Sequence, residues 1–387
     1  MDSHDLAKSI TSWLETQAHA EQTAFSSIPD LGIDFGSTIG LVRKENQDRI
    51  VVAEYRDPIN QAQDFVMAAL SDGMGGGRDG GYCASSTLAR IVFALTSRST
   101  NKNLIDHLVS VCKDASEALF DEYKDKGGTT FSAVIISRSG ETAVVNVGDS
   151  RVHQLQLGAR DSEAHSKFNQ LTQDDNIAGE IAKIRGRLPS DLSGNEYANH
   201  LTQYIGAGKD IEPRVYEVSD DGRSSLLVAT SDGAHNIGES VLGKLALFMP
   251  SSSEFVRRTL HVSRWTGGQD NASILCVNTE LLKDYLRVGA TERNSLTIWT
   301  VGGSRQYFSI SSESHRGDQR VKKGLGFFFS DKDAELDESA SDDKKPKATR
   351  VKRKAPTKDQ VAKQETLDIE ITSSTEKKDS KNGSGNN

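Results

Sequence analysis

The chain has 387 residues, 35% of them hydrophobic, and its formal net charge at pH 7 is −8. This length allows one large domain or two ordinary ones, and a net negative chain argues against general nucleic-acid binding. Its three cysteines, Cys83, Cys112 and Cys276, are widely spaced and form no CxxC pair. That pattern favours buried thiols in a reducing compartment over a disulfide or a zinc site. Because no apolar run approaches the roughly 18 residues of a membrane span, and the N-terminus lacks the layout of a signal peptide, we expect a cytoplasmic protein with no membrane partner.

The predicted elements begin with a short amphipathic helix over about residues 5–22, in which Leu6, Ile10 and Leu14 recur on one face. From about 31 to 280 the chain is rich in strands, with long helical segments between them. The strand candidates are Ile50–Glu54, Phe65–Leu70, Phe131–Ser137, Thr142–Val147, Val152–Leu157, Leu226–Thr230 and Ser273–Val277. The helix candidates are Tyr82–Arg98, Leu104–Lys124, Ala178–Arg187, Glu239–Phe248 and Glu254–Trp265. Hairpins dominate and regular βαβ alternation is absent, so we predict an α+β fold with mainly antiparallel sheets.

Beyond residue 281 the pattern weakens, although Leu296–Val301 and Tyr307–Ile310 are candidates for two short strands around Gly302 and Gly303. The tail is acidic over Asp331–Asp343 and basic over Lys344–Lys354, and its composition predicts disorder. The basic run is typical of a nuclear-import or nucleic-acid patch, or of a solvated tail that pairs with its own acidic block, and we favour the second interpretation. The predicted parts are an N-terminal helical extension (1–28), a main domain (29–280), a C-terminal extension (281–327) and a disordered tail (328–387).

Acidic residues stand where apolar strands end. Asp72 and Asp232 each close an apolar run and are followed by glycine, and Asp149 follows the strand that ends at Val147. A carboxylate in this position lies at the rim of a sheet, where the glycine lets another group approach the backbone closely. Several carboxylates on one rim repel each other unless a cation joins them. The pattern therefore predicts a site for hard, oxygen-ligated metal ions.

Several short motifs follow one another along the same region. They are Gly40-Leu-Val-Arg43-Lys-Glu-Asn46-Gln-Asp48, Ser71-Asp72-Gly73-Met-Gly75-Gly76, Gly127-Gly-Thr-Thr130, Val147-Gly-Asp149-Ser-Arg151, Leu171-Thr-Gln-Asp-Asp175, Leu201-Thr-Gln-Tyr-Ile-Gly206, Ser231-Asp232-Gly233 and Gly268-Gln-Asp270-Asn271. One of these alone is a weak signal. In this order, across roughly residues 31–280, they resemble the metal-dependent serine/threonine protein phosphatases of the PPM or type 2C family, and its bacterial members in particular.

The resemblance implies a fold and an activity. The fold would be a four-layer α/β/β/α sandwich, in which two antiparallel sheets are flanked by helices and the metals lie in a cleft at one sheet edge. The main domain, 29–280, would be the phosphatase domain. The activity would be hydrolysis of phosphoserine and phosphothreonine in proteins, with a metal-bridging water attacking phosphorus. The implied partners are a phosphorylated protein substrate and an opposing serine/threonine kinase.

The resemblance also implies a site, with two to three Mn²⁺ or Mg²⁺ ions as cofactors, because all-oxygen ligands suit hard cations. Asp72 would bridge two metals, and the Gly73 carbonyl would face them. Asp232 and Asp270 would complete the ligands of the first metal, and Asp149 with Asp232 would hold a third. Arg43 would clamp the phosphate with its planar guanidinium, and Asp48 would act through water. Asn271 would brace Asp270, and Asn46 would also stand behind the ligands.

Two positions depart from the family pattern. Gln47 stands where the family often has glutamate, and a neutral amide is a poorer ligand for a hard cation, so the second metal would be held less tightly. Met74 stands where eukaryotic members often have histidine, as it does in many bacterial members. No histidine general acid is then available at this position, and metal-bound water would protonate the leaving alkoxide. The polar segment Asp174–Asn199 corresponds to the mobile flap of the family and fits a surface segment that covers the substrate.

Two other classes of function stay open. A pseudophosphatase would keep the fold only to bind phosphoproteins, but the intact Asp72, Asp232 and Asp270 argue against it. The segment Gly32-Ile-Asp34-Phe-Gly36-Ser-Thr38 resembles the first phosphate loop of actin-like and sugar-kinase ATPases, and Asp72-Gly-Met-Gly-Gly-Gly resembles the second. In those ATPases the two loops lie much further apart in the chain, and such a fold would leave Asp232 and Asp270 without a role.

Overall fold

The structure, a computed structural model, describes residues 3–17, 23–74, 79–97, 104–124, 126–156, 166–186, 200–218, 225–288 and 294–310. The chain divides into two units, residues 1–325 and 326–387, and all described residues belong to the first unit. The predicted disordered tail and its basic run therefore lie outside the described residues, as do Gly75, Gly76 and much of the predicted flap, residues 187–199. The domain boundaries given above stay predictions.

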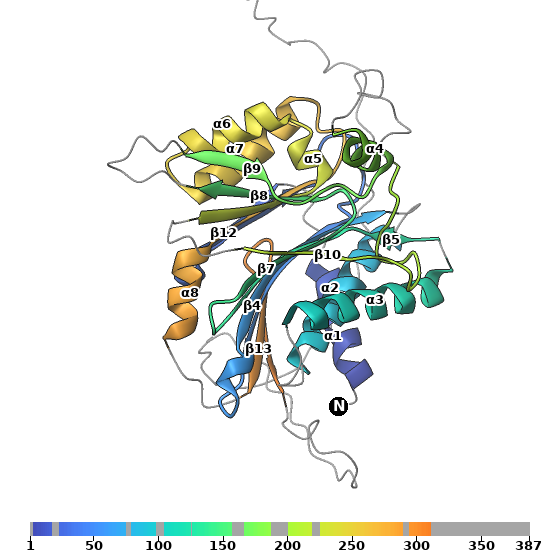
Figure 1. Ribbon diagram of the computed structural model, residues 1–387, viewed down its shortest axis with the longest axis vertical. Helices are drawn as coiled ribbons and strands as arrows, with labels where there is room; N and C mark the ends of the chain where they lie inside the picture. Colours follow the sequence, from blue (N-terminus) through green and yellow to red (C-terminus); the bar gives the residue numbers. More distant parts are fainter. Residues whose placement is uncertain are drawn as a thin grey trace, which may run out of the picture. The chain divides into compact units, whose positions relative to one another are not determined.

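Two antiparallel sheets form the centre of the first unit (Figure 1). The six-stranded sheet has, in order, β1 (Ala24–Ile28), β2 (Ile33–Thr38), β12 (Ala272–Asn278), β11 (Ser225–Thr230), β8 (Arg151–Gln156) and β9 (Lys167–Gln170). The eight-stranded sheet has β10 (Arg214–Glu217), β7 (Thr142–Val147), β6 (Phe131–Ser137), β4 (Phe65–Met74), β3 (Asp48–Arg56), β13 (Ser295–Thr300) and β14 (Arg305–Ser309), with β5 (Gly128–Thr129) paired to the end of β4. Each strand runs antiparallel to its neighbours.

Helices cover the outer face of each sheet (Figure 1). The eight-stranded sheet carries α1 (Ser3–Gln17), α2 (Asp79–Thr96) and α3 (Leu104–Tyr123), and the six-stranded sheet carries α5 (Asp232–His235), α6 (Glu239–Phe248) and α7 (Ser252–Trp265). Two further helices are α4 (Ile177–Arg185) and α8 (Thr279–Arg287), and two short 3-10 turns are Pro29–Leu31 and Gln61–Gln63. The layer order is helices, sheet, sheet, helices, which confirms the predicted α+β class and the α/β/β/α sandwich.

Strand β4 shows how the sequence builds these layers. Phe65, Met67 and Ala69 point to the helical side, where they join the core under α1–α3. The alternate residues, Val66, Ala68 and Leu70, join the core between the two sheets. A central strand that is buried on both faces must be apolar at every position, which explains the continuous apolar run in the sequence.

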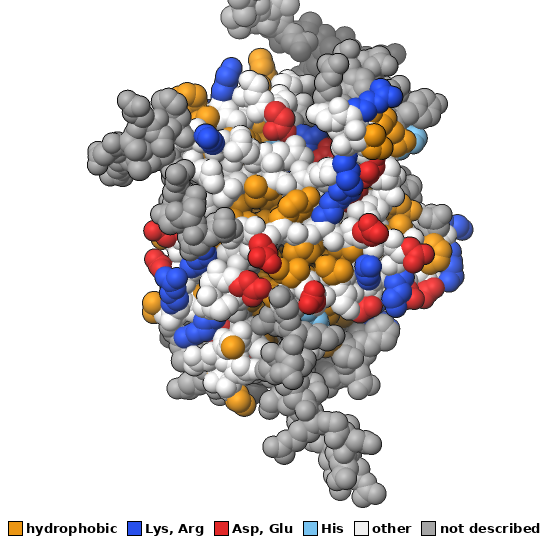
Figure 2. Space-filling model, in the orientation of Figure 1, with side chains coloured by type: hydrophobic (Ala, Val, Ile, Leu, Met, Phe, Trp, Pro, Cys, Tyr) orange, Lys and Arg blue, Asp and Glu red, His pale blue; other side chains and the backbone are white. Residues whose placement is uncertain are grey.

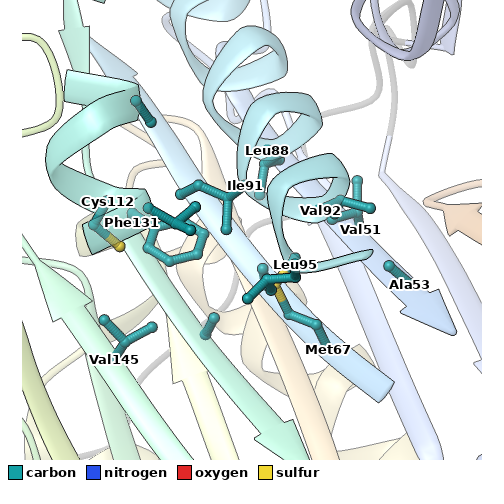
Figure 3. Close-up of a cluster of buried hydrophobic side chains, with 14 of the residues drawn as sticks. Val51, Ala53, Met67, Leu88, Ile91, Val92, Leu95, Cys112, Phe131 and Val145 are labelled. Carbon is teal, nitrogen blue, oxygen red and sulfur yellow. The ribbon is translucent and has the colours of Figure 1, made fainter. Parts of the chain in front are cut away.

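The core on the helical side is close-packed around α2 (Figure 3). Leu88, Ile91 and Leu95 of this helix lie against side chains of the strands beneath, such as Met67, and none of the four is more than 2% exposed. Burying such side chains stabilises the fold by roughly 1.5–3 kcal/mol each before the loss of conformational entropy is counted. Because β4 is held between two cores, the carboxylate near its end is presented on a rigid element.

The predicted helices and strands that fall on described residues are present, with shifts at their ends. Sequence reasoning missed β1, β2, β5, β9, β10, α5 and α8. It also took the β2 segment as a possible phosphate loop. In the structure Gly36 is an interior residue of that strand, and a Cβ there would lie 2.9 Å from the Ala24 carbonyl oxygen. The glycine therefore serves close packing within the sheet, and the segment is not a loop.

The surface of the described residues shows no single-sign charge field in the view of Figure 2, where Lys and Arg side chains are interspersed with Asp and Glu around apolar side chains. Among the described helices, none combines the length and the apolar character needed to cross a membrane.

Candidate active site

Both sheets bring carboxylates to one end of the sandwich. Asp48 begins β3 and is the direct cross-strand partner of Asp72 on β4. In the other sheet, Asp232 begins α5 directly after β11, and Asp270 lies just before β12. Like charges directly opposite one another on neighbouring strands are destabilising. A pairing of Asp48 with Asp72 therefore needs a compensating partner.

The two Asp-Gly pairs are places of close backbone approach. A Cβ at Gly73 would lie 2.1 Å from the carbonyl oxygen of Gly80, at the beginning of α2. A Cβ at Gly233 would lie 2.0 Å from the carbonyl oxygen of Asn271. Only glycine fits at either position. The glycines therefore let Asp72 and Asp232 lie against the segments that carry the other site residues.

Two asparagines fix the loop that precedes β3. The Asn271 side chain accepts a hydrogen bond from the Gln47 N–H at 2.8 Å and donates to the carbonyl oxygens of Ile39 and Glu45. Its backbone N–H donates to Asp270 Oδ1 at 2.8 Å. The Asn46 side chain accepts from the Asp48 N–H at 3.1 Å and donates to the Ser37 hydroxyl. Asn271 thus ties the loop that carries Arg43 and Gln47 to Asp270.

Burial and mutual repulsion raise the pKa of the carboxyls in this cluster. The pKa of Asp48 rises to about 7, mainly through burial, with the Asp232 and Asp270 carboxylates adding to it and hydroxyl donors opposing it. The pKa of Asp72 rises well above its ordinary value through burial and then the charges of Asp48, Asp232, Asp149 and Asp270. The pKa of Asp232 rises to about 6, through burial and then Asp270. The ionised cluster is therefore costly on its own.

Asp149 belongs to the same electrostatic group. It follows Gly148, which has a φ of +105° at the turn between β7 and β8. Burial raises the pKa of Asp149 to about 7, and the carboxylates of Asp232 and Asp174 add to this effect. The carboxylates predicted for the site are thus close enough for their charges to act on one another.

Arg43 is the cation that meets this cluster from solvent. Its Nη2 lies 2.6 Å from Asp270 Oδ2, and its side chain is half exposed. The hydrogen bond to Asp270 raises the pKa of Arg43, and the charges of Asp270, Asp232 and Asp72 contribute in the same direction. The guanidinium is therefore placed at the mouth of the cluster, where an anion arriving from solvent would meet it.

The side chains present fit divalent cations. Asp48 Oδ1 and Asp232 Oδ1 are buried oxygens with no hydrogen-bond partner, and an unpaired buried carboxylate oxygen is costly unless a cation faces it. The donors are all oxygens, which suits Mg²⁺ or Mn²⁺. Within the described ranges, no three His, Cys, Asp or Glu side chains are already gathered as ligands of one ion, and Asp270 is paired with Arg43 instead.

Sequence reasoning found the carboxylates but missed two hydroxyl residues that hold them. Ser231 donates to Asp48 Oδ2 at 2.8 Å, which links the two sheets. The Thr130 hydroxyl accepts from the Asp72 N–H at 3.0 Å, and the Thr130 N–H donates to the Asp72 carbonyl oxygen at 2.9 Å. Both residues stand inside the quoted motifs. Their positions in these motifs, Ser231 next to Asp232 and Thr130 after Gly127-Gly128, could have indicated this supporting role.

The comparisons with known proteins agree with this geometry. The chain is 24% identical over 247 residues to protein phosphatase PhpP of Streptococcus pneumoniae, a match that covers 62% of this chain and 94% of the relative. It is 26% identical to the PPM Ser-Thr phosphatase MsPP from Mycobacterium smegmatis, solved in complex with cacodylate, with a TM-score of 0.51 over 64% of this chain and 98% of that one. The serine/threonine phosphatase of S. agalactiae shares the fold, with a TM-score of 0.52 at 20% identity over 66% of this chain and 98% of that one. No protein-family model matches the chain.

An α/β/β/α sandwich with an acidic cluster at one end of its sheets, together with these relatives, defines a protein phosphatase, which is a hydrolase. The chain resembles the PPM family of serine/threonine phosphatases, and its bacterial members in particular.

We predict that the metal-free protein becomes more stable as the pH falls from about 8 to about 5. The carboxyls of Asp48, Asp149 and Asp232 have folded-state pKa values of about 7, about 7 and about 6, above the ordinary value of 3.8. Between these values the folded state binds more protons than the unfolded state, so the free energy of unfolding falls as the pH rises. Thermal unfolding in a chelating buffer measures this.

Asp72→Asn is the variant that isolates the effect, because it removes one charge from the cluster. Its unfolding midpoint should depend less on pH than that of the wild type over the same range. An equal or steeper dependence in Asp72→Asn would contradict the prediction.

Proposed function

We propose that the protein hydrolyses phosphoserine and phosphothreonine in proteins with the help of two to three divalent ions, Mn²⁺ or Mg²⁺. The observation that carries this proposal is the cluster of buried carboxylates, which two sheets hold together although their charges repel. Such a cluster is stable when cations join it, and a cation cluster is what a phosphate dianion needs. When bound, the ions neutralise the phosphate and lower the pKa of the attacking water.

The carboxylates divide the work of holding these ions. The charges of Asp48, Asp232, Asp149 and Asp270 all act on Asp72, and we assign it as the residue that two ions would share, with the Gly73 carbonyl beside it. Asp232 and Asp270 would hold the first ion with it. Asp149, whose field includes Asp232 and Asp174, is assigned to a third and weaker ion.

Asp48 differs from the other carboxylates, because Ser231 already bonds one of its oxygens. Its remaining oxygen, Oδ1, is buried and without a partner. We therefore assign Asp48 to bind a water at the site rather than to bind an ion directly.

Arg43 is assigned as the phosphate clamp. Its guanidinium is half exposed and bonded to Asp270. If Asp270 held an ion, Arg43 would be free to bind phosphate, because its planar fork matches two phosphoryl oxygens. Met74 has no proton to give, so the proton that the leaving serine or threonine alkoxide needs must come from water.

The proposal also includes an opposing kinase and a reducing compartment, and it excludes two alternative functions. An opposing serine/threonine kinase is implied by any phosphoserine substrate. Cys83, Cys112 and Cys276 are buried and free, which supports a reducing compartment such as the cytoplasm. The ATPase alternative loses its first phosphate loop, because that segment is β2. A pseudophosphatase is separated from the proposal by the turnover experiment below.

We predict that Asp72→Ala and Asp232→Ala each abolish turnover of a small phosphomonoester in the presence of Mn²⁺, because each removes a carboxylate that two ions share. The rate of hydrolysis measures this, with circular dichroism to show that the fold is kept. Asp284→Ala is a matched control, because Asp284 is an exposed aspartate paired with Arg287 on α8. Retention of more than about a tenth of wild-type activity in either site variant would sink the shared-ligand assignment, and a wild type without turnover would favour the pseudophosphatase.

We predict that Asp48→Asn weakens activation by Mn²⁺, whereas the effect of Gln47→Glu depends on where that side chain points. The Gln47 N–H donates to the Asn271 side chain. A Cβ added at Gly80 would lie 3.0 Å from Gln47 Cδ, so the Gln47 side chain faces the beginning of α2. If this position reaches the second ion, Gln47→Glu should lower the Mn²⁺ concentration for half-maximal rate by up to ~10-fold. Titration of the rate with Mn²⁺ measures both, and an unchanged curve for Asp48→Asn would remove this segment from the site.

A further inference from the structure

A buried arginine stands next to the metal site without belonging to it. Arg49 follows Asp48 on β3, and its side chain is only 9% exposed. Its Nη1 donates to the carbonyl oxygens of Asn46 at 2.6 Å and of Asp48 at 3.0 Å. The guanidinium therefore holds the backbone on both sides of Gln47, in the segment that carries Asn46 and Asp48.

The other donors of Arg49 reach two helices. Its Nε donates to the Ser85 hydroxyl of α2 at 3.0 Å, and its Nη2 donates to Glu15 Oε1 of α1 at 3.2 Å. The Ser85 hydroxyl donates to the same Glu15 oxygen. A Cβ at Gly81 would lie 2.5 Å from Arg49 Nη2, so the backbone of α2 closes over the guanidinium. Glu15, Ser85 and Arg49 thus form one polar contact between α1, α2 and β3.

The N-terminal helix is held firmly enough for this contact to matter. Ile10 and Leu14 of α1 are buried in the core on the helical side, and Glu15 is the next residue along the helix. The same helix borders a small pocket of about 40 Å³, which is lined by Leu14 and Gln17 of α1, by Asp48 and by Thr300 of β13. Residues of α1 and β13 therefore line the same pocket as Asp48.

A buried guanidinium needs a counter-charge, and in this structure Glu15 supplies it. Without that carboxylate, the buried guanidinium would lose its charged partner and would turn away from its present position. It would also let go of the Asn46 and Asp48 carbonyl oxygens as it turned. Both changes would weaken the site for a divalent cation.

We propose that Glu15 is a positioning residue for the metal site: through Arg49 it fixes the Asn46–Asp48 segment, and the docked helix α1 thereby sets the affinity of the protein for divalent metal. This inference rests on the proposed function, because it assumes that the carboxylate cluster binds metal. It assigns to the N-terminal helix a role in the site that the family motifs do not contain.

The test is Mn²⁺ binding to the full-length protein, measured by titration calorimetry, for wild type and Glu15→Gln. We expect the dissociation constant to rise by about 10-fold in the variant, the scale of change seen when a residue that supports a ligand is lost. The rate at saturating Mn²⁺ should change less than about twofold, because no reacting group is removed. Arg49→Lys should raise the dissociation constant in the same direction, and Glu15→Gln combined with Arg49→Lys should cost less than the sum of the single changes.

Thr16→Ala is the matched control on the same helical turn, because the Thr16 hydroxyl donates to the Trp13 carbonyl and has no hydrogen bond to Arg49. It should bind Mn²⁺ as the wild type does. A readout without metal comes from hydrogen exchange of the Gln47 and Asp48 amides, which should be faster in Glu15→Gln than in Thr16→Ala. Glu15→Asp keeps the charge and should recover part of the affinity, which separates loss of the counter-charge from undocking of α1.

The outcomes separate the two proposals. A wild type that binds no Mn²⁺ would overturn the proposed function. A wild type that binds Mn²⁺, together with a Glu15→Gln protein of unchanged affinity and unchanged amide exchange, would overturn the role of Glu15 and leave the proposed function standing. Equal losses in Glu15→Gln and Thr16→Ala would reduce Glu15 to a residue that only stabilises α1.

Discussion

Repulsion between carboxylates that the fold forces together is the constraint on which the rest of this site depends. Asp48 and Asp72 face each other across two strands, and Asp232 approaches them from the other sheet. Packing fixes these positions, because each residue lies at the end of an element whose remaining side chains are buried in a core. The packing of the sandwich therefore offsets the repulsion between the like charges. Bound cations would remove that repulsion and stabilise the folded state.

The contacts between the two sheets are polar at the site and apolar in the core. Ser231 ties the end of β11 to Asp48, and Asn271 ties the beginning of β12 to the loop that leads into β3, so short polar bonds join the sheets at the site end. Elsewhere the sheets meet through apolar side chains. This division lets the apolar contacts provide stability while the polar contacts set the positions of the acidic residues. The Glu15–Arg49 contact is a further polar contact of this kind, and it joins the N-terminal helix to the segment that carries Asp48.

Most helices and strands, and the carboxylates at the ends of apolar strands, could be predicted from the sequence because their signals are local, whereas the layer order followed from the resemblance to the PPM family. An apolar run that ends in Asp-Gly can be recognised without knowledge of its neighbours, as at Asp72 and Asp232. Strand β2 was missed because Asp34 and Gly36 interrupt its apolar pattern, and the reason for Gly36 is the nearby backbone of β1. Strands β9 and β10 are short edge strands with no buried residue, so they carry little periodicity. The pairing of Glu15 with Arg49 joins residues 34 positions apart, and nothing in either neighbourhood announces it.

The most direct test of the central claim, that this carboxylate cluster is a divalent-metal centre, is an anomalous difference map at the manganese edge from crystals grown with Mn²⁺. The account predicts two peaks roughly 4 Å apart, with Asp72 between them, Asp232 and Asp270 on one of them, and Arg43 no longer bonded to Asp270. A map with no peak within ligand distance of Asp72, from protein that hydrolyses phosphomonoesters in the same buffer, would contradict it.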